Sequence, residues 1–572
     1  MDKTFVLTEL ALSLLIFFLA GKIKSYPSNK WRLLYIAPMF VAVIFSFLVD
    51  FNFISIGVYI ACAVFLGWYY TENVRLRRVM AAVAILITGA LASYLLTDPD
   101  YKTQNYYSDF KSAFENMKSH YVLDKEKGID WDELYSKYEP RFKEVQDRQD
   151  STMNYKVWME FVGEFYDDHV GYTMKNDDDM RKAFCEAYGN DYGLSLIRLS
   201  SGEYVAVNVE GCGESFSIGS DKDPIDLREI KDKYIVKDAD RNTISEVGIK
   251  NGTIITKWDG KPIDDYLEDV RFSLFASPDR ENEDFYKPLY VAGMGGESVE
   301  ITFLDDNGEE KTVTAPKLGP YISRLYDTIV KIDGGIEITN LEWQEVNEDT
   351  ALIRISEMAY DSNSYEETDY AEMTRKLRDE IEELRSKGVK NIIFDLRQNS
   401  GGSPYMVEGV AGLFAPVGEH TSYYSAVIDE DTARFNRGSD GKYIKNKELT
   451  YMGEDLWHDG KIILLVNGET VSAGDDMTYM MGDYPNVTVA GFTKTNSSCQ
   501  AVGSIKMQEG ELSFSAVPNL DPDGNVAIDT FTDHVGRVPF DEKIPFTEEV
   551  IAAIFDRGED YQIDYVVKNL LD

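Results

Sequence analysis

Cysteine is scarce in this chain, with only four among 572 residues. No two of them form a Cys-x-x-Cys pair, so a structural zinc site is not expected, and we predict neither a metal nor an organic cofactor. A chain of this length can also bury enough apolar surface to fold without a disulfide framework. The sequence leaves open one bridge, between Cys185 and Cys212, while Cys62 and Cys499 suggest no pairing.

Basic residues are also in short supply, with 58 Lys and Arg against 99 Asp and Glu and a formal net charge of −41. The first 98 residues carry a slight positive excess, so the acidic charge belongs to the rest of the chain. Such a domain repels phosphate backbones and anionic headgroups, and no nucleic-acid partner is expected. The acidic surface itself is interpreted as a solubilising one.

Long apolar runs are confined to the first 98 residues. They cover residues 5–20, 33–49, 51–70 and 79–96, and each is about as long as a helix that crosses a bilayer core of roughly 30 Å. Basic residues gather in the first and third connections, which the positive-inside rule places in the cytoplasm. The sequence therefore predicts an all-α transmembrane bundle over residues 1–98, embedded through four helices. It predicts a multi-pass cell-membrane protein whose remaining chain is extracytoplasmic.

Residues 99–190 have the pattern of a helical cap domain. Apolar residues recur at three- and four-residue spacing over 107–121, 131–149 and 155–166, which predicts three helices. The third stretch leads into Asp167, Asp168 and His169, and the chain has only five histidines. A histidine after two acids is more often a surface residue than a catalytic one.

Residues 191–318 change to short alternating strands with glycine turns. Residues 297–314 read as a hairpin with Asp-Asn-Gly at its turn, and residues 251–263 read NGTIITKWDGKPI. These features resemble a PDZ domain with an insertion over residues 212–243. The resemblance implies that a peptide C-terminus binds at the carboxylate-binding loop, although a PDZ fold kept as a spacer is the alternative. The loop positions are Gly193, Leu194, Ser195 and Leu196.

Residues 319–572 alternate buried strand patterns with helices. Apolar strands at 349–355 and 389–397 flank an amphipathic helix at 365–387, and strands at 461–468 and 486–492 flank a second helical stretch. Apolar strands that alternate with helices predict an α/β layer architecture.

Two short motifs in this last region bear on chemistry. Asp395, Arg397 and the pair Gly401 and Gly402 follow one apolar strand, where glycines let backbone N–H groups approach a developing negative charge. Ser472 lies between another strand and a helix, a position typical of an exposed nucleophile. Taken alone, a serine at such a junction is more often a helix N-cap.

Together the motifs resemble those of the tail-specific, or C-terminal processing, serine peptidase family over residues 106–572. The resemblance implies a ClpP/crotonase-like α/β core with Ser472 as the nucleophile. It also implies an oxyanion hole made by the Ala473 N–H and that of Gly401 or Gly402. Asp475 stands where many members have Glu.

The general base departs from the pattern of many family members, which use a Lys after the nucleophile. Alignment puts Ser497 or Asn496 at that position, and neither is a base at neutral pH. Lys494 lies two or three residues too early. Another branch of the family takes a His from the cap, which implies His169 here, since histidine titrates near neutrality. Candidates for orienting this His are Asp168, Asp529 and Asp533.

We therefore predict a serine peptidase that hydrolyses protein or peptide substrates through an acyl-enzyme at Ser472, with His169 as base and Lys494 as the weaker candidate. The alternative is an inactive peptidase-like ectodomain that binds peptide C-termini. The predicted fold class is multidomain: transmembrane bundle, helical cap, PDZ-like β domain and α/β core over residues 1–98, 99–190, 191–318 and 319–572.

Overall fold

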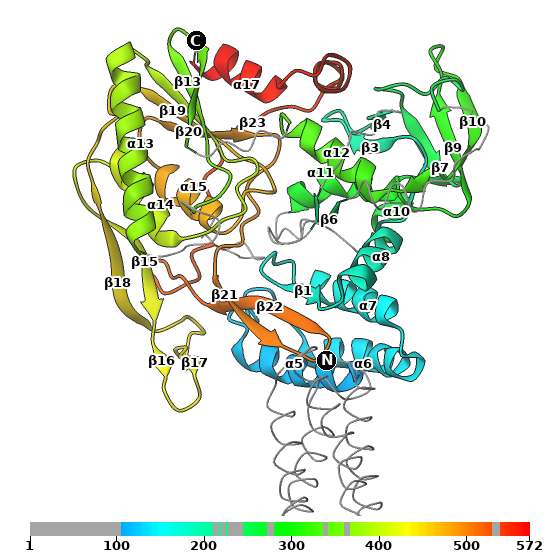
Figure 1. The fold of residues 1–572 in the computed structure, drawn as a ribbon, viewed down its shortest axis with the longest axis horizontal. Coiled ribbons are helices and arrows are strands. Elements are labelled where there is room, and N and C mark those ends of the chain that lie inside the picture. The colour runs from blue at the N-terminus through cyan, green and yellow to red at the C-terminus, as the bar shows by residue number, and fades with distance from the viewer. Residues whose placement is uncertain are drawn as a thin grey trace, which may run out of the picture. The chain divides into compact units, whose positions relative to one another are not determined.

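The computed structural model describes residues 105–209, 217–218, 225–226, 244–270, 280–335, 341–359, 367–528 and 538–571 (Figure 1). Tyr106–Asp572 form one unit. This unit contains N-terminal helices, a β-rich middle part and a C-terminal α/β part, in the order that the sequence predicts. The domain boundaries themselves stay predictions.

The predicted transmembrane bundle lies outside the described residues. Among the helices of the described part, none is long and apolar enough to cross a membrane. The longest one, Glu367–Lys387, buries one apolar stripe and is otherwise rich in charge, as a helix on the face of a sheet is. We therefore correct the fold class to a mixed α/β fold, and the multi-pass membrane localisation and the membrane-embedded bundle are withdrawn.

A six-stranded sheet of order β12-β13-β14-β19-β20-β23 organises the C-terminal part. Strand β12 pairs antiparallel with β13, and the other neighbours are parallel. The strand bounds are Trp343–Asn347 (β12), Thr350–Arg354 (β13), Asn391–Asp395 (β14), Lys461–Leu465 (β19), Val487–Gly491 (β20) and Glu542–Lys543 (β23). Because parallel strands end at one edge, the segments after β14 and β19 lie next to each other.

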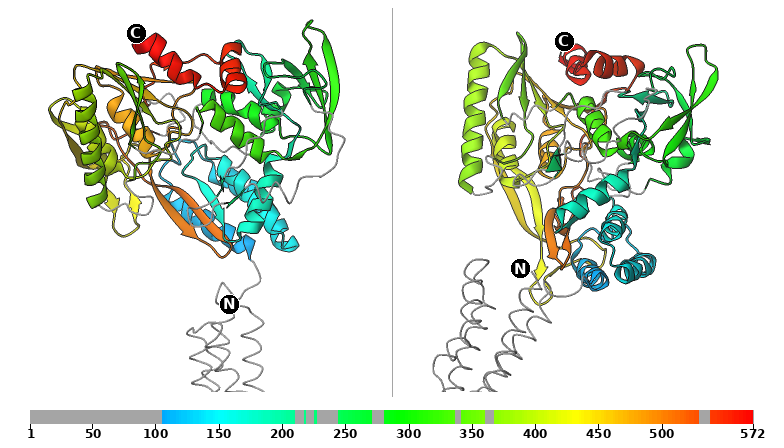
Figure 2. Two further views of the ribbon diagram at one scale, coloured as in Figure 1. Left: turned by 45° about the horizontal axis from the view of Figure 1, so that its top comes forward. Right: turned by 45° about the vertical axis from the view of Figure 1, so that its right-hand side comes forward.

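Both faces of this sheet are buried, which explains the continuous apolar runs in its central strands. Ile392, Phe394, Ile462 and Leu464 face helices α13, α14 and α15. Their alternating neighbours join a second core with the C-terminal helices and with strands β3 and β4. Figures 1 and 2 show α13 and the C-terminal helices on opposite sides of the sheet. The helix bounds are Glu367–Lys387 (α13), Pro404–Phe414 (α14), Ala473–Met481 (α15), Glu548–Ile551 (α16, continued by a π-helical Ala552–Arg557) and Tyr561–Val566 (α17, continued by Val567–Leu571).

The three predicted cap helices are confirmed as Tyr106–His120 (α5), Trp131–Arg148 (α6) and Ser151–Gly163 (α7). Asp130 caps α6 by accepting from two backbone N–H groups, and Asp150 caps α7 by accepting from Met153 N–H. Stacked rings fix their packing, with the Phe110 and Phe142 centroids 4.3 Å apart. Strand β1 (Gly171–Met174) and helix α8 (Asp177–Tyr188) follow, and β1 joins β22 (Gly510–Val517) and β21 (Ala501–Lys506) of the C-terminal part in one sheet.

The β-rich middle part contains the predicted hairpin as β9 (Ser298–Leu304) and β10 (Glu310–Pro316). These strands form a sheet of order β10-β9-β7-β8, while β3 and β4 pair separately. Its further elements are β2 (Asn190–Asp191), β3 (Ser195–Arg198), β4 (Tyr204–Val207), β5 (Ser217–Ile218), β6 (Ile225–Asp226), β7 (Ile255–Trp258), β8 (Lys261–Pro262), α10 (Asp264–Leu267), α11 (Arg280–Val291), β11 (Gly319–Pro320) and α12 (Ile322–Ile332).

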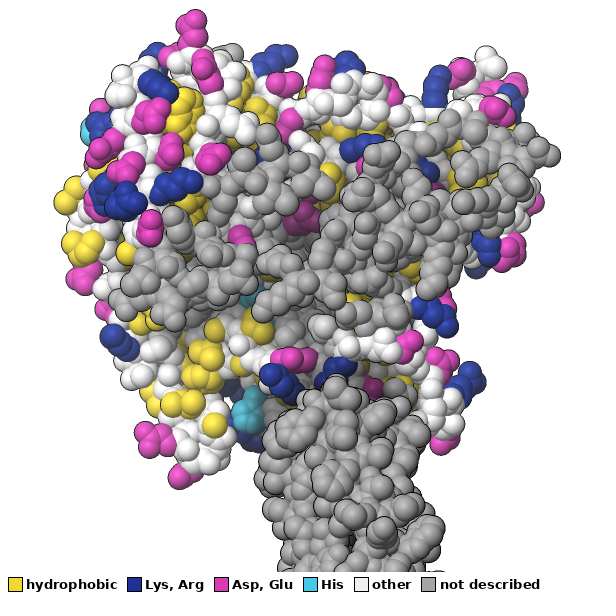
Figure 3. Space-filling model, viewed as in Figure 1, with side chains coloured by type: hydrophobic (Ala, Val, Ile, Leu, Met, Phe, Trp, Pro, Cys, Tyr) yellow, Lys and Arg dark blue, Asp and Glu magenta, His cyan; other side chains and the backbone are white. Residues whose placement is uncertain are grey.

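A long two-stranded ribbon completes the C-terminal part. It consists of β15 (Gly418–Ala426) and β18 (Lys445–Gly453), with the short pair β16 (Ile428–Asp429) and β17 (Arg434–Phe435) between them. Arg437 ties this region to the cap by a two-pronged ion pair with Glu126. On the face shown in Figure 3, Lys and Arg are interspersed among Asp and Glu.

Candidate active site

Ser472 occupies a sharp turn between β19 and α15. Its backbone has φ 58° and ψ −118°, a conformation that an L-residue adopts only under strain, at a cost on the order of 1–3 kcal/mol. Its side chain makes no capping hydrogen bond to α15. The interpretation of this serine as a side-chain N-cap of α15 is therefore wrong. Because the strained backbone costs stability, we infer that it is kept for function.

The glycine loop after β14 packs directly against this serine. Gly401 has φ 98°, and a Cβ placed there would lie 2.6 Å from Ser472 Cβ and 3.1 Å from its Oγ. Gly402 has φ 134°, and a Cβ there would lie 2.4 Å from the carbonyl oxygen of Met358. Only glycine allows this backbone to approach the Ser472 side chain so closely.

Two backbone N–H groups beside Ser472 are unused. Gly401 N–H donates to Asn399 Oδ1 over 2.9 Å, so it is already occupied. Within the described ranges, neither Gly402 N–H nor Ala473 N–H has a hydrogen-bond acceptor. Of the two glycines that the sequence left open for the oxyanion hole, Gly402 is the one whose N–H has no acceptor in the described part of the chain.

Asn399 holds the glycine loop and the serine turn together. Its backbone carbonyl accepts from Val471 N–H over 3.0 Å, and its Nδ2 donates to Ile355 carbonyl over 2.7 Å. The side chain is fully buried. Because buried hydrogen bonds are costly to break, Asn399 fixes the spacing between Gly401 and Ser472.

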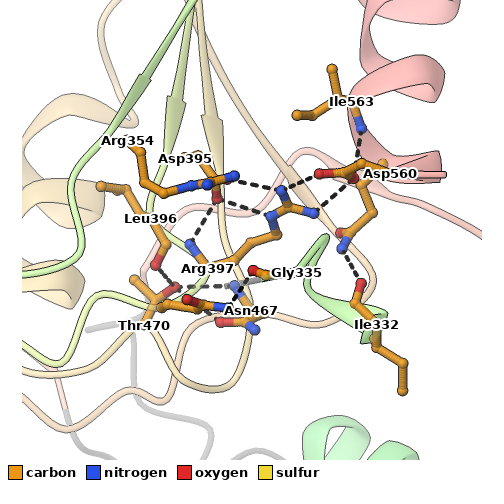
Figure 4. A network of polar contacts seen from close by, with 12 residues as sticks. Ile332, Gly335, Arg354, Asp395, Leu396, Arg397, Asn467, Thr470, Asp560 and Ile563 are labelled. Atoms are coloured by element: carbon orange, nitrogen blue, oxygen red, sulfur yellow. Dashed lines mark hydrogen bonds and ion pairs between the residues drawn. The ribbon is translucent and has the colours of Figure 1, made fainter. Parts of the chain in front are cut away.

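A buried ion-pair network anchors the start of the glycine loop (Figure 4). Arg397 is fully buried and makes two-pronged contacts with Asp395 and with Asp560. Arg354 also donates to Asp395, at 2.9 and 3.0 Å. Burial alone would raise the pKa of the Asp395 carboxyl, but the two guanidinium groups hold it below its usual value. Asp395 and Arg397, the first residues of the predicted motif after the apolar strand, thus have a structural role.

Residues 495–500 form the third wall of the site. Ser472 N–H donates to the Ser498 carbonyl over 2.7 Å. Asp475, buried in the first turn of α15, accepts from the N–H groups of Ser497 and Ser498 at 2.9 and 3.0 Å. Asp475 therefore supports the site by shaping this loop, in the position where the resemblance placed a supporting acid.

The same Ser498 receives the cap loop that carries His169. Asp168 N–H donates to Ser498 Oγ over 3.1 Å, across 330 residues of sequence. Asp167 is fully buried and accepts from His169 N–H, from Tyr121 Oη and from Ser515 Oγ at 3.0, 3.0 and 2.8 Å. The fold therefore brings the Asp-Asp-His motif to the loop that is hydrogen-bonded to Ser472.

His169 itself is buried, with 9% of its surface exposed. Its Nδ1 has no hydrogen-bond partner among the described residues, and no hydrogen bond joins its ring to Ser472. The orienting carboxylate is thus not seen on Nδ1, and Asp529 and Asp533 lie outside the described residues. Hydrogen bonds of catalytic groups are often long in a ligand-free enzyme and tighten when substrate binds.

The alternative base positions serve the loop instead. Asn282 of α11 binds the backbone N–H and carbonyl of Lys494, and no hydrogen bond in the described part joins Lys494 to Ser472. Asn496 is fully buried and donates through Nδ2 to the Gly468 carbonyl over 3.1 Å. Ser497 has φ 67° and is held through its N–H by Asp475.

Three acids in this region of the fold, Asp168, Asp333 and Glu469, have raised pKa values. Burial raises the pKa of Asp168 to about 6, against the opposing pull of His169. Burial also raises the pKa of Asp333, although Arg397 opposes it. The pKa of Glu469 is raised by burial and by the Asp333 and Asp168 carboxylates. Of these acids, Asp168 directly precedes His169 and Glu469 lies in the turn before Ser472, and perturbed carboxyl groups of this kind gather at functional sites.

The predicted peptide-binding loop is largely internal. Leu194, Ser195 and Leu196 are fully buried, and Ser195 Oγ lies 2.8 Å from Thr328 Oγ1 and accepts from Tyr321 Oη. Gly193 has φ 94°, and its N–H donates to Asp191. Peptide binding at this loop stays a prediction.

Sequence reasoning missed Ser498, Asn399 and the acids Asp333 and Glu469. Asn399 lies between Arg397 and Gly401 of the motif after the apolar strand and could have been singled out there. The other three carry no signal in the sequence, because their roles depend on contacts between segments that lie far apart. Cys185 is a free thiol, and Cys212 lies outside the described residues, so the bridge left open between them is not seen.

Comparisons with known proteins agree with this geometry. The model of peptidase family S41 matches residues 349–530, which include Gly402 and Ser472, and the model of the tricorn protease C1 domain matches residues 103–151. No curated protein sequence matches the chain.

Among solved structures, mature CPAF is similar at 13% identity with a TM-score of 0.51, covering 82% of this chain and 97% of that one. This likeness shows a shared fold. The photosystem II D1 C-terminal processing protease is similar at 14% identity and a TM-score of 0.34, covering 79% and 97% of the two chains. A putative peptidase from Parabacteroides merdae ATCC 43184 is similar at 16% identity and 0.39, covering 82% and 98%. The match to the peptidase family S41 model includes the glycine loop and the serine turn, and the chain is a serine-type peptidase.

Proposed function

We propose that the chain hydrolyses peptide bonds of protein or peptide substrates with Ser472 as the nucleophile and His169 as the general base. One observation carries the proposal: Ser472 is held in a strained turn against Gly401, between two N–H groups that have no acceptor in the described part of the chain. Those N–H groups belong to Gly402 and Ala473. An acyl-transfer site needs this combination of a partly exposed hydroxyl and preorganised donors.

The steps follow from the positions of these groups. His169 takes the hydroxyl proton as Ser472 Oγ attacks the carbonyl carbon, and the negative charge that forms on oxygen is stabilised by the Gly402 and Ala473 N–H groups. His169 then gives the proton to the leaving amine as the peptide bond breaks. A water, deprotonated by His169, attacks the acyl-enzyme, and the returning proton regenerates the Ser472 hydroxyl.

The contact between the cap loop and Ser498 supports His169 over Lys494. Asp168 N–H donates to Ser498 Oγ, and Ser472 N–H donates to the Ser498 carbonyl, so Ser498 contacts both the cap loop and the serine turn. Lys494 is held by its backbone to α11 instead. Asp167 accepts from His169 N–H in a fully buried position, which fixes the backbone that presents the imidazole.

The test uses three variants of the full chain: Ser472→Ala, His169→Ala and Lys494→Ala. Cleavage of an unfolded fluorogenic protein should fall by about 10³-fold or more in the first two, because each removes a member of one unit. The Lys494→Ala variant should keep most of the activity. A fluorophosphonate reagent should label the wild type and Lys494→Ala, but not Ser472→Ala.

Thermal unfolding must show that all three variants are folded. The proposal fails if a folded Ser472→Ala enzyme cleaves normally. The assignment of the base alone fails if Lys494→Ala is inactive while His169→Ala is not.

A further inference from the structure

A cavity of about 330 Å³ lies away from the serine turn, between the β3–β4 turn, helix α11 and the ends of strands β20 and β23 of the six-stranded sheet. No residue of the candidate active site contributes to its walls. Ligand sites in proteins favour such junctions between parts of a fold, and their volumes begin at about this size. The walls of this cavity include Arg198, Asp284, Phe285, Phe492, Lys543 and Phe546.

The floor of the cavity is aromatic. Phe492 and Phe546 are buried, with ring centroids 4.9 Å apart and a tilt of 67°. Phe285 packs edge-on against Phe546, with centroids 5.5 Å apart, and is only partly covered. Rings in this arrangement present edges and faces to a third apolar group, so an aromatic or branched aliphatic body would fit there.

The rim of the cavity carries excess positive charge. Arg198 and Lys543 are exposed on it, against the single carboxylate of Asp284. Arg198 donates through Nε to the Gly202 carbonyl and lies over the Tyr204 ring, and in the described ranges it has no ion pair with an acid. This is unusual in a chain with 99 acidic residues for 58 basic ones. A guanidinium in this position is suited to a carboxylate.

The walls are preformed. Ser200 N–H donates to the Phe546 carbonyl, and Phe546 N–H donates back to Ser200 Oγ, both over 2.9 Å. The β3–β4 turn and the segment after β23 are thus joined at the cavity. Because these walls are already ordered, the binding of a ligand would cost little free energy for ordering the protein.

We infer that this cavity binds a small carboxylate with an aromatic or branched apolar body, at a site separate from Ser472. The apolar body occupies the phenylalanine floor, and the carboxylate meets Arg198 and Lys543. A free aryl or alkyl acid and the C-terminal residue of a peptide share this chemistry.

The experiment measures binding to the full-length Ser472→Ala protein, so that neither turnover nor the assignment of the nucleophile affects the result. The probes are 3-phenylpropanoate, N-acetylphenylalanine and the uncharged N-acetylphenylalaninamide, followed by ligand-observed NMR. Both acids should bind, and the amide should bind several-fold more weakly. A hexapeptide ending in Phe identifies the source: binding tighter than that of 3-phenylpropanoate indicates a peptide tail, and weaker binding indicates a free acid.

Two substitutions, one of an exposed basic residue and one of an exposed acidic residue, test the role of the rim charges. Arg198→Gln should weaken binding of the acids by about 3- to 10-fold, and Asp284→Asn should tighten it by a smaller factor, with no change for the amide. Arg375→Gln, an exposed arginine on α13, is the matched control and should leave binding unchanged. The inference is overturned if the amide binds as tightly as the acids, or if Arg198→Gln binds them like Arg375→Gln.

Discussion

The Ser498 hydroxyl offers the sharpest test of how the cap reaches the nucleophile. Its Oγ accepts from Asp168 N–H over 3.1 Å, while its backbone carbonyl separately accepts from Ser472 N–H. Ser498→Ala removes the first contact and keeps the second. A neutral hydrogen bond of this kind contributes about 0.5–1.5 kcal/mol, and 1.4 kcal/mol corresponds to a tenfold change in a population.

We therefore expect kcat to fall by about 2- to 10-fold in Ser498→Ala as the His169 loop leaves its place more often, with KM little changed. The assay is steady-state cleavage of a fluorogenic substrate within a double-mutant cycle. In the His169→Ala background, Ser498→Ala should have no further effect. Ser504→Ala, which removes an exposed hydroxyl from neighbouring β21, is the control. The reasoning is refuted if Ser498→Ala is fully active, or if it costs the same factor with and without His169.

Two further predictions concern the walls of the site. Gly401→Ala should be inactive and less stable, because its Cβ would lie 2.6 Å from Ser472 Cβ in a backbone with φ 98°. Gly128→Ala is the control, since Gly128 has φ 65° but open space around it, and this variant should lose stability and keep its activity. Urea unfolding measures the stability of both variants, and the cleavage assay measures their activity. Asp168 binds its proton more tightly in the folded state, with a pKa of about 6 against 3.8, so it lowers the free energy of unfolding as pH rises from about 4 to 6. Asp168→Asn should remove this slope, gaining about 3 kcal/mol relative to the wild type between pH 4 and 7 in urea titrations, and parallel curves for the two proteins would contradict the shift.

The local elements of this fold were predictable because each follows one period. The cap helices, the hairpin at β9 and β10, and α13 all come from apolar spacing that contacts elsewhere do not override. The junction at Ser472 was likewise readable from a strand pattern next to a helical one. The strain at Ser472 was not, since φ 58° depends on the packing of Gly401 and on the Ser498 carbonyl.

Longer-range features escaped prediction for a common physical reason. Whether Gly401 or Gly402 presents a free N–H depends on the Asn399 side chain, which binds one and leaves the other. Burial raises the pKa of Asp333, and burial together with the Asp333 carboxylate raises the pKa of Glu469, which no local pattern encodes. The expected transmembrane bundle rested on the apolar runs and on the basic residues in their connections, and the described part of the chain holds no helix that could cross a membrane.

The absence of a lysine base is explained by what its aligned positions do. Asn496 donates from its backbone to the Thr470 carbonyl and from its side chain to the Gly468 carbonyl, and it is fully buried. A lysine there would place an ammonium in the space of these contacts and would free the 467–472 turn that sets Ser472. Ser497, with φ 67°, is committed through its N–H to Asp475. Both positions thus build the turn, which agrees with the proposal that the proton acceptor is His169 of the cap.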